Sequence, residues 1–252
     1  MFDSEFINIL AKLISATIIC YVIGSIPVCH LISRKRGINI VEVGSKLAGS
    51  SNETKNLGKL LGSAAFFGDF FKGILAINIC ILIGIEGNLM LLPLMGAIIG
   101  HCKPVFAKFK GGDGMAVLGG SALAIFGIYA VLAIIGAVLI AFGTKKIKRV
   151  SSLTGFATGY LILSGTSIAV SGISIFIFGF GGVYALVLAH AINGHRVRNS
   201  TPISEWANAN THLLTPAIST TSNPNWVSMD SVSFSESFNH YHLFYKYTNN
   251  DK

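Results

Sequence analysis

The chain has 252 residues, of which 52% are hydrophobic and 12% charged, and its mean hydropathy is +0.64. Up to about residue 195 this composition excludes an ordinary water-soluble protein, because too few polar side chains remain to cover a wetted surface. The net charge of +8 would suggest nucleic-acid binding in a soluble protein, but the basic residues form clusters between apolar runs. Such clusters are typical of membrane topology signals. We therefore expect an all-α membrane protein with no nucleic-acid partner.

The first half of the chain predicts three membrane spans. Residues 13–32 form the first, which we interpret as a retained span rather than a cleaved signal. The polar segment at 33–62 holds six Lys and Arg residues and should be cytoplasmic. The second span, at 64–85, ends in a link at 86–88 without Lys or Arg, which should lie outside. The third span then ends near residue 104.

The apolar stretch at residues 115–143 must cross an even number of times if the basic clusters on both its sides are cytoplasmic. It is about 28 residues long, so we expect two short helices hinged near Gly127. Two more spans follow, at residues 153–168 and 172–191. The total is about seven short transmembrane helices, with the N-terminus outside and the C-terminus cytoplasmic.

Two regions are predicted to differ in order. Residues 1–202 should form the polytopic membrane domain. Residues 203–252 are polar and rich in Ser, Asn and Thr, which indicates a mostly disordered cytoplasmic tail. The four cysteines have no paired spacing typical of a metal or redox motif, so we expect small core residues, no metal and no cofactor.

The loop at residues 44–58 is rich in Gly, Ser, Asn and Lys, the residue types that surround a phosphate. Glycines allow successive backbone N–H groups to point at one anion, while the polar side chains add donors. It is not a nucleotide-binding P-loop, because Ser50 follows Gly49 where that motif requires Gly-Lys-Ser/Thr. Taken alone, an ordinary flexible loop remains an open alternative.

Three further polar clusters follow along the chain. Asp69 and Lys72 are three residues apart on one helix face near the entrance to the second span. They form either a substrate site or an ion pair that orients the helix. Residues 100–114 place three glycines in four positions after Lys110, opening an apolar helix, which favours an anion site at a helix N-terminus. The last cluster is His190, Asn193 and Arg196, whose spacing of three places them on one face if the helix continues.

Taken in order, these clusters resemble the bacterial acyl-phosphate-dependent glycerol-3-phosphate acyltransferases, the PlsY family. The resemblance extends over about residues 24–201. It is carried by Gly24-Ser25-Ile26-Pro27, by Gly44, Ser45, Gly49, Ser51 and Asn52 in the first loop, by Asp69, Lys72 and Gly73, by the block at 100–114, and by His190, Asn193 and Arg196. One such motif is weak, but the ordered set is specific.

The resemblance implies an enzyme that moves a fatty acyl group from acyl-phosphate to position 1 of glycerol 3-phosphate. The product would be lysophosphatidic acid, and the enzyme would lie in the bacterial cell (inner) membrane with its site facing the cytoplasm. Its partners would be glycerol 3-phosphate, acyl-phosphate and membrane lipids. The resemblance implies Ser45 and His190 as catalytic residues. It implies as substrate-binding residues Ser51, Asn52, Lys55, Lys72, His101, Lys110, Gly111, Gly112, Asn193 and Arg196.

The sequence departs from the family pattern at four positions: Lys46 and Leu47 replace a Gly and an Asn, Lys55 replaces an Arg, and Asp113 replaces a Lys. Lysine lacks the two-pronged phosphate contact of arginine, and Asp113 reverses a charge beside the expected anion site. We hypothesise that Lys46 compensates for that charge. A catalytically weakened paralogue, acting as a membrane binding or regulatory protein, is the alternative function. An unrelated transporter is disfavoured because the charges lie at helix ends and no inverted repeat is visible.

Overall fold

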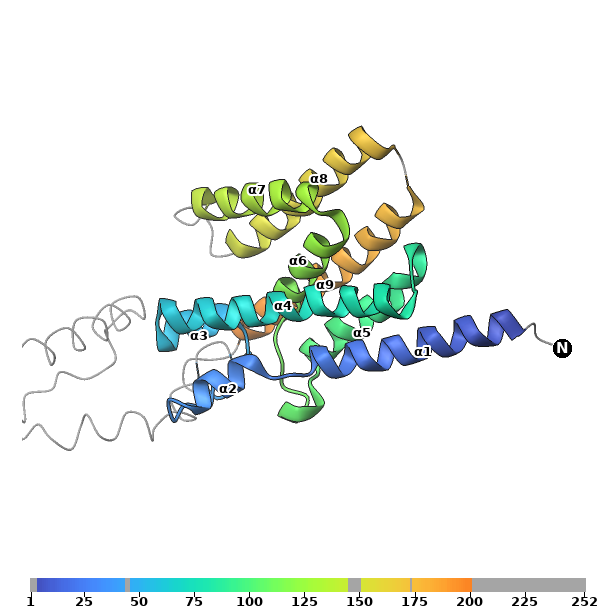
Figure 1. The fold of residues 1–252 in the computed structure, drawn as a ribbon. Helices are drawn as coiled ribbons and strands as arrows, with labels where there is room; N and C mark the ends of the chain where they lie inside the picture. Colours follow the sequence, from blue (N-terminus) through green and yellow to red (C-terminus); the bar gives the residue numbers. More distant parts are fainter. Residues whose placement is uncertain (1–3, 44–45, 145–150, 173, 201–252) are drawn as a thin grey trace, which may run out of the picture. The chain divides into compact units, whose positions relative to one another are not determined.

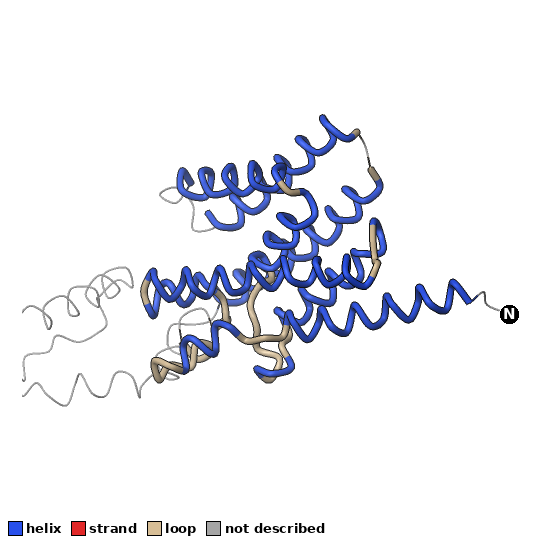
Figure 2. Tube along the Cα trace, viewed as in Figure 1, coloured by secondary structure: helices blue, strands red, loops and turns tan. Residues whose placement is uncertain are grey.

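The computed structural model describes residues 4–43, 46–144, 151–172 and 174–200, and within these ranges every regular element is a helix (Figures 1 and 2). In chain order the helices are α1 (Ser4–Gly24), α2 (Val28–Arg34), α3 (Ser50–Leu57), α4 (Lys59–Ile83), η1 (Gly87–Met90), α5 (Leu91–Cys102), η2 (Val105–Ala107), α6 (Met115–Phe126), α7 (Ile128–Thr144), α8 (Ser151–Ser171) and α9 (Ile175–Ser200). The tail predicted at 203–252 lies outside the described residues.

Within the described part of the chain, five segments are long and apolar enough to cross a membrane. They are Ser4–Arg34, Lys59–Ile83, Gly87–Ala107, Ser152–Val170 and Ile175–Gly194. The chain is therefore a multi-pass, all-helical membrane protein over these residues, as predicted.

The first span begins earlier than predicted and is broken. Helix α1 starts at Ser4 and ends at Gly24, and α2 starts at Val28 after an interruption that contains Pro27. Proline has no backbone N–H and disfavours helical geometry at the residue before it, so one continuous helix over 13–32 cannot form. The predicted span is present within Ser4–Arg34, but it consists of two helices. The break leaves backbone carbonyls at the end of α1 without helical partners.

The polar segment at 33–62 also differs from the predicted loop, because it contains α3 and the first turn of α4. Gly58 separates the two helices with a φ of 93°, a left-handed value that glycine adopts without strain. Since α4 begins at Lys59, Asp69 and Lys72 lie three turns inside this helix rather than near its entrance. Helix α4 thus begins five residues before the predicted start of the second span.

The apolar stretch before residue 144 folds as two helices. Helix α6 ends at Phe126, α7 begins at Ile128, and Gly127 between them has a φ of 53°. The hinge predicted near Gly127 is therefore present. Neither α6, with 12 residues, nor α7, with 17, is as long as a typical span.

Glycines allow the helices around the core to approach closely. Helix α1 packs along α5, and α4 packs along α6. At the α1–α5 crossing, a methyl group at Gly24 would overlap the Ala97 carbonyl, and one at Gly100 would overlap the Tyr21 carbonyl. Small residues at such crossings are how membrane helices gain packing contacts without a hydrophobic driving force. The close crossing sets α5, and hence His101, against the break between α1 and α2.

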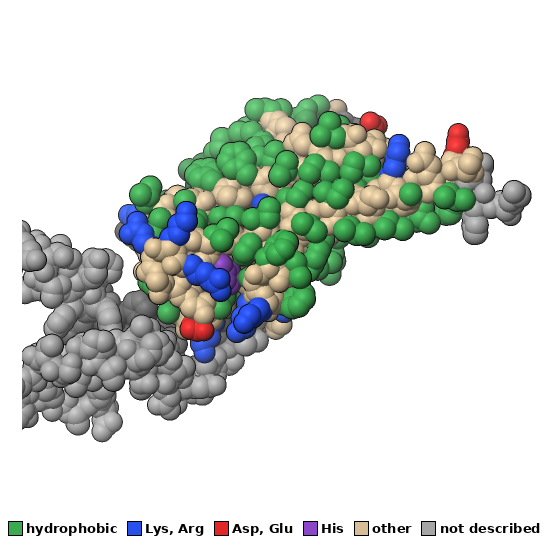
Figure 3. Space-filling model, turned by 60° about the horizontal axis from the view of Figure 1, so that its bottom comes forward, with side chains coloured by type: hydrophobic (Ala, Val, Ile, Leu, Met, Phe, Trp, Pro, Cys, Tyr) green, Lys and Arg blue, Asp and Glu red, His purple; other side chains and the backbone are tan. Residues whose placement is uncertain are grey.

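Charged side chains gather at one end of the described helices (Figure 3). The face shown is covered along its flank by hydrophobic side chains, and Lys and Arg side chains cluster where α2, α3 and the adjoining loops lie. The exposed basic residues of these segments are Arg34, Lys35, Arg36, Lys46, Lys55, Lys59, Lys103, Lys108 and Lys110. The loops predicted to bind anions lie at this basic end.

Candidate active site

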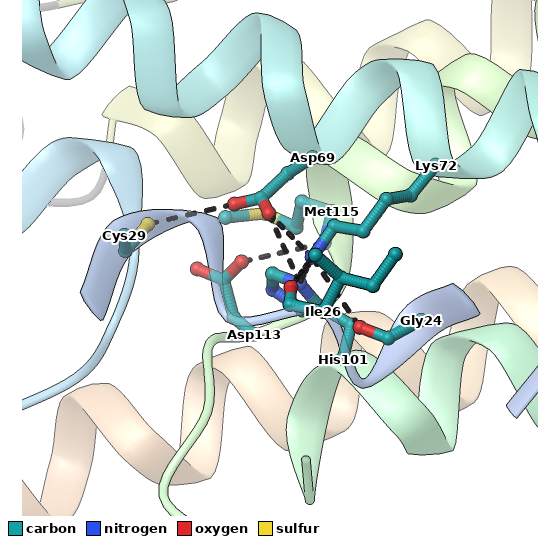
Figure 4. Close-up of polar contacts among 8 residues, drawn as sticks. All are labelled: Gly24, Ile26, Cys29, Asp69, Lys72, His101, Asp113 and Met115. Atoms are coloured by element: carbon teal, nitrogen blue, oxygen red, sulfur yellow. Dashed lines mark hydrogen bonds and ion pairs between the residues drawn. The ribbon is translucent and has the colours of Figure 1, made fainter. Parts of the chain in front are cut away.

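A buried cluster of charged side chains lies at the break between α1 and α2 (Figure 4). Asp69 Oδ1 is 2.7 Å from Lys72 Nζ, and both side chains are almost fully buried. The Lys72 ammonium also donates to the carbonyl oxygens of Ile26, at 2.8 Å, and of Gly24, at 3.3 Å. The Gly24 carbonyl belongs to the last residue of α1, where helical partners are missing, and a cation at a helix C-terminus is electrostatically favourable. The Ile26 carbonyl also accepts the Val28 N–H. Lys72 therefore links α4 to the C-terminal end of α1 through hydrogen bonds.

His101, from the last turn of α5, completes this cluster. Its Nδ1 lies 3.4 Å from Lys72 Nζ and 3.5 Å from Asp69 Oδ1. The second Asp69 oxygen, Oδ2, accepts a bond from the Cys29 thiol of α2 at 3.6 Å. Side chains of α2, α4 and α5 thus meet at one carboxylate, so the acidic charge has partners on several sides, as a buried membrane charge requires.

The two glycine-bearing loops are joined by backbone hydrogen bonds next to this cluster. Gly112 N–H donates to the carbonyl of His101 at 3.3 Å, and Ala48 N–H donates to the carbonyl of Gly111 at 3.1 Å. A methyl group at Gly111 would overlap the His101 carbonyl, and one at Gly112 would overlap His101 Nε2. Only glycine permits this approach. Lys46 and Lys110, both exposed, flank the joined segments.

Two hollows adjoin the cluster. The first is a cavity of only about 10 Å³, lined among others by Asp69, Lys72 and His101. The second is a largely apolar groove of about 520 Å³ between α2 and α4. The groove is lined by Ile26, Val28, Gly68, Phe71, Lys72, Ile74, Leu75 and Asn78. Ile26, Val28 and Lys72 border both hollows, so the groove ends at the polar cluster.

The first loop is shaped from within by Asn52. Its side-chain amide is buried and donates to the carbonyls of Ile40, Val43 and Leu47, at 2.9 to 3.0 Å. These bonds fold the segment before α3 back onto the start of that helix. Direct substrate binding by Asn52 stays a prediction, but its observed contacts are with the loop itself.

The N-terminus of α6, predicted as an anion site, is contacted by a side chain of the protein. Asp113 Oδ1 accepts the N–H of Met115 at 3.3 Å (Figure 4). A carboxylate at this position stabilises the helix through its dipole. It also places a negative charge where a phosphate was expected to bind.

The other predicted site residues fall in three places. Ser51, Lys55 and Lys110 are exposed at the basic end, whereas Gly111 and Gly112 are buried beside His101. His190 and Asn193 are exposed on α9, and this helix continues to Ser200, so the expected common face with Arg196 exists in the backbone. One turn before His190, Val187 approaches Gly114. Ser45 lies outside the described residues, as does the side chain of Arg196.

Comparison of the sequence with known proteins identifies its family. The sequence profile described as glycerol-3-phosphate acyltransferase matches residues 14–200. The chain belongs to the glycerol-3-phosphate acyltransferase family. It is 32% identical over 181 residues to the glycerol-3-phosphate acyltransferase of Thermosipho melanesiensis, covering 71% of this chain and 86% of that protein. It is 36% identical over 143 residues to the Bacillus subtilis enzyme, covering 56% and 72% respectively.

Solved structures of this acyltransferase family agree with the fold. The crystal structure of PlsY (YgiH), an integral membrane glycerol 3-phosphate acyltransferase in its glycerol 3-phosphate form, superimposes with a TM-score of 0.60 and 27% identity. That match covers 81% of this chain and 92% of PlsY. The lysophosphatidic acid form of PlsY gives a TM-score of 0.58 and 26% identity over the same shares. The family predicted from the ordered motifs is confirmed.

Glu53 of this acyltransferase family member was not among the residues predicted from sequence. It lies on α3 with a fully buried side chain, and among the described residues neither carboxylate oxygen has a hydrogen-bond partner. Burial, and next the charge of Asp69, raise the pKa of Glu53 from 4.5 to about 7. Only its neighbour Asn52 is also buried on α3, and the polar composition of this helix does not distinguish an inward from an outward face.

We expect Glu53→Gln to stabilise this acyltransferase increasingly as the pH rises from 5 to 8. Between pH 4.5 and 7 the folded chain holds a proton that the unfolded chain releases, so stability falls with rising pH through that window. Glutamine does not ionise and avoids this loss, which is on the order of 3 kcal/mol above pH 7. Melting curves in detergent at several pH values measure it, with the exposed Glu42→Gln as control. A difference in melting temperature between Glu53→Gln and the wild type that is constant across pH would contradict a buried Glu53 that binds a proton.

Proposed function

We propose that this chain transfers a fatty acyl group from acyl-phosphate to the position-1 hydroxyl of glycerol 3-phosphate, giving lysophosphatidic acid. Family membership supports the acyltransferase role. The similar PlsY has been solved in glycerol 3-phosphate and lysophosphatidic acid forms, which names an acceptor and a product for that protein. We carry both over to this chain.

The observation that carries the proposal is the junction of an apolar groove with the polar cluster. The groove between α2 and α4 lies within membrane-spanning segments and has hydrophobic side chains along most of its wall. A fatty acyl chain fits such a groove, because apolar walls match its hydrocarbon and the polar end fixes its reactive head. The basic, glycine-bearing loops at that end then face the phosphate groups.

Acyl transfer here requires positioning more than a strong base. The glycerol hydroxyl oxygen attacks the acyl carbonyl carbon, the carbon–oxygen bond to phosphate breaks, and the hydroxyl proton leaves with the phosphate as hydrogen phosphate. The flanking Lys46 and Lys110, with backbone N–H groups of the joined loops other than those of Ala48 and Gly112, would stabilise the negative charge that develops on the carbonyl and phosphate oxygens. The predicted catalytic pair, Ser45 and His190, would act at the same end.

The proposed membrane arrangement keeps seven crossings, with five long segments and the two short helices α6 and α7 as a hairpin. The basic end would face the cytoplasm of a bacterial inner membrane, with the N-terminus outside and residues 203–252 as a cytoplasmic tail. Single cysteines placed at residues 87 and 108 test this. A membrane-impermeant thiol reagent applied from outside whole cells should label the first and spare the second. The reverse pattern would invert the topology.

Purified full-length protein, acyl-phosphate and labelled glycerol 3-phosphate give the direct test of the reaction. We expect lysophosphatidic acid to form well above a His190→Ala control. Replacing acyl-phosphate by acyl-coenzyme A should abolish the product, which tests the donor separately. No product above the control would reject the enzyme and leave the alternative of a weakened, binding paralogue.

Narrowing the groove should change the preferred donor. Leu75 lines the groove and is half exposed, so Leu75→Trp should lower kcat/KM for hexadecanoyl phosphate about threefold more than for octanoyl phosphate. The matched control is Leu82→Trp, on the same helix, exposed and away from the groove lining. Equal effects of both variants on the two donors would remove the acyl chain from this groove.

A further inference from the structure

His101 connects the buried ion pair to the glycine-bearing segment. On one side its Nδ1 faces Lys72 and Asp69, at 3.4 and 3.5 Å. On the other side its Nε2 lies against Gly112, and its backbone carbonyl accepts the Gly112 N–H. We propose that the Asp69–Lys72 pair, through His101, positions the Gly111–Gly112 backbone for the reaction without contacting the substrates. This inference rests on the proposed function and gives the three side chains a role within it.

Burial and bonding favour positioning over direct binding. Asp69, Lys72 and His101 are 2%, 6% and 6% exposed. The Lys72 ammonium donates to the Asp69 carboxylate and to two backbone carbonyls, and His101 Nδ1 lies at hydrogen-bond distance from it. The adjoining cavity of about 10 Å³ offers roughly the space that one water molecule requires, which is too little for a phosphate ester. A substrate phosphate would have to displace contacts that hold three helices together.

The ring orientation of His101 is therefore set from the ion-pair side and transmitted to the loop side. Nδ1 is committed to the pair whichever of the two hydrogen-bonding tautomers forms. If the imidazole ring turned, Nε2 would press on Gly112. Gly112 has no side chain that could rearrange, so its backbone would have to move. Gly111 in turn accepts the N–H of Ala48, so a shift would reach the first loop as well. Both candidate phosphate segments depend on one buried histidine.

A charge-removal cycle separates positioning from simple stabilisation. Asp69→Asn or Lys72→Met alone leaves an uncompensated buried charge, and each should lower the melting temperature strongly. The double variant Asp69→Asn/Lys72→Met removes both charges, and we expect its melting temperature to recover to near that of the wild type. His101 nevertheless loses the partners that orient it. The double variant therefore tests whether the pair positions the Gly111–Gly112 backbone, in a protein whose stability is restored.

Hydrogen exchange and kinetics provide the two readouts. In the double variant, amide exchange in residues 103–114 should be about tenfold faster than in the wild type. The kcat of the double variant should fall to about one tenth of the wild-type value or below, because the backbone amides of this segment are no longer held in place. The matched control is Tyr184→Phe, which removes a buried hydroxyl that bonds the Phe156 carbonyl between α8 and α9. It should change the melting temperature without changing exchange in residues 103–114.

A double variant that regains wild-type exchange and kcat together with its stability would overturn the proposal, since the pair would then be structural only. A Lys72→Met variant with a raised KM and unchanged exchange would also overturn it, in favour of direct substrate binding. If the wild type transfers no acyl group, the proposed function fails by itself. Exchange in residues 103–114 still decides whether the pair positions the loop.

Discussion

Gly112→Ala should lower kcat/KM for acyl transfer by about 100-fold or more, since displacing reacting groups by about 1 Å costs that much. The backbone of Gly112 is not in the left-handed region, so alanine is not excluded by conformation. The obstacle is space: the added methyl group would overlap His101 Nε2 and lie 2.9 Å from the Ala48 carbonyl oxygen. Either His101 or the joined loops must move.

Gly182→Ala is the matched control for this substitution. Gly182 lies on α9, and a methyl group there meets no other atom within 4 Å. Alanine in a helix interior is favoured over glycine by up to about 1 kcal/mol, so this variant should keep full activity and melt slightly higher. Steady-state kinetics and melting curves of the two variants measure the comparison. Wild-type activity in Gly112→Ala would show that the approach to His101 does not matter.

The sequence predicts the parts of the fold that depend on local composition. Hydropathy locates the apolar segments, and the basic clusters at 103–110 and 145–149 predict two short helices hinged near Gly127, a hinge that is present in the structure. The break at Pro27 could have been inferred from proline chemistry, but the apolar run around it masks the interruption. Helix α3 was missed because its mostly polar residues have the composition of a loop.

The site is less predictable, because burial of polar groups depends on contacts between distant segments. Asp69 and Lys72 could be paired from their spacing, yet their link to His101, 29 positions further on, arises from the packing of α1, α4 and α5. Glu53 is one of several polar residues on α3, and no local pattern indicates that its side chain is buried. The motifs predict candidate site residues, while the structure separates exposed lysines such as Lys55 and Lys110 from the buried cluster of Asp69, Lys72 and His101.

Asp113→Lys should lower the KM for glycerol 3-phosphate about 30-fold, if the α6 N-terminus binds phosphate. The Asp113 carboxylate accepts the Met115 N–H and places a negative charge at that terminus. Replacing it by lysine changes the local charge by two, worth roughly 2 kcal/mol toward a nearby anion in a partly wetted site. Asp113→Asn changes the charge by one and can keep the bond to Met115, so about fivefold is expected.

Salt and a distant acid provide the controls for this charge series. The difference in KM for glycerol 3-phosphate between the variants and the wild type should become smaller as ionic strength rises, since salt screens charges at a solvent-exposed surface. Glu86→Gln, an exposed acid in the link between α4 and η1, should leave the KM unchanged. The ordered series Asp, Asn, Lys, measured as KM at low and high salt, is the expected result. An unchanged KM in Asp113→Lys would show that phosphate binds elsewhere, and the negative charge at α6 would then serve helix stability alone.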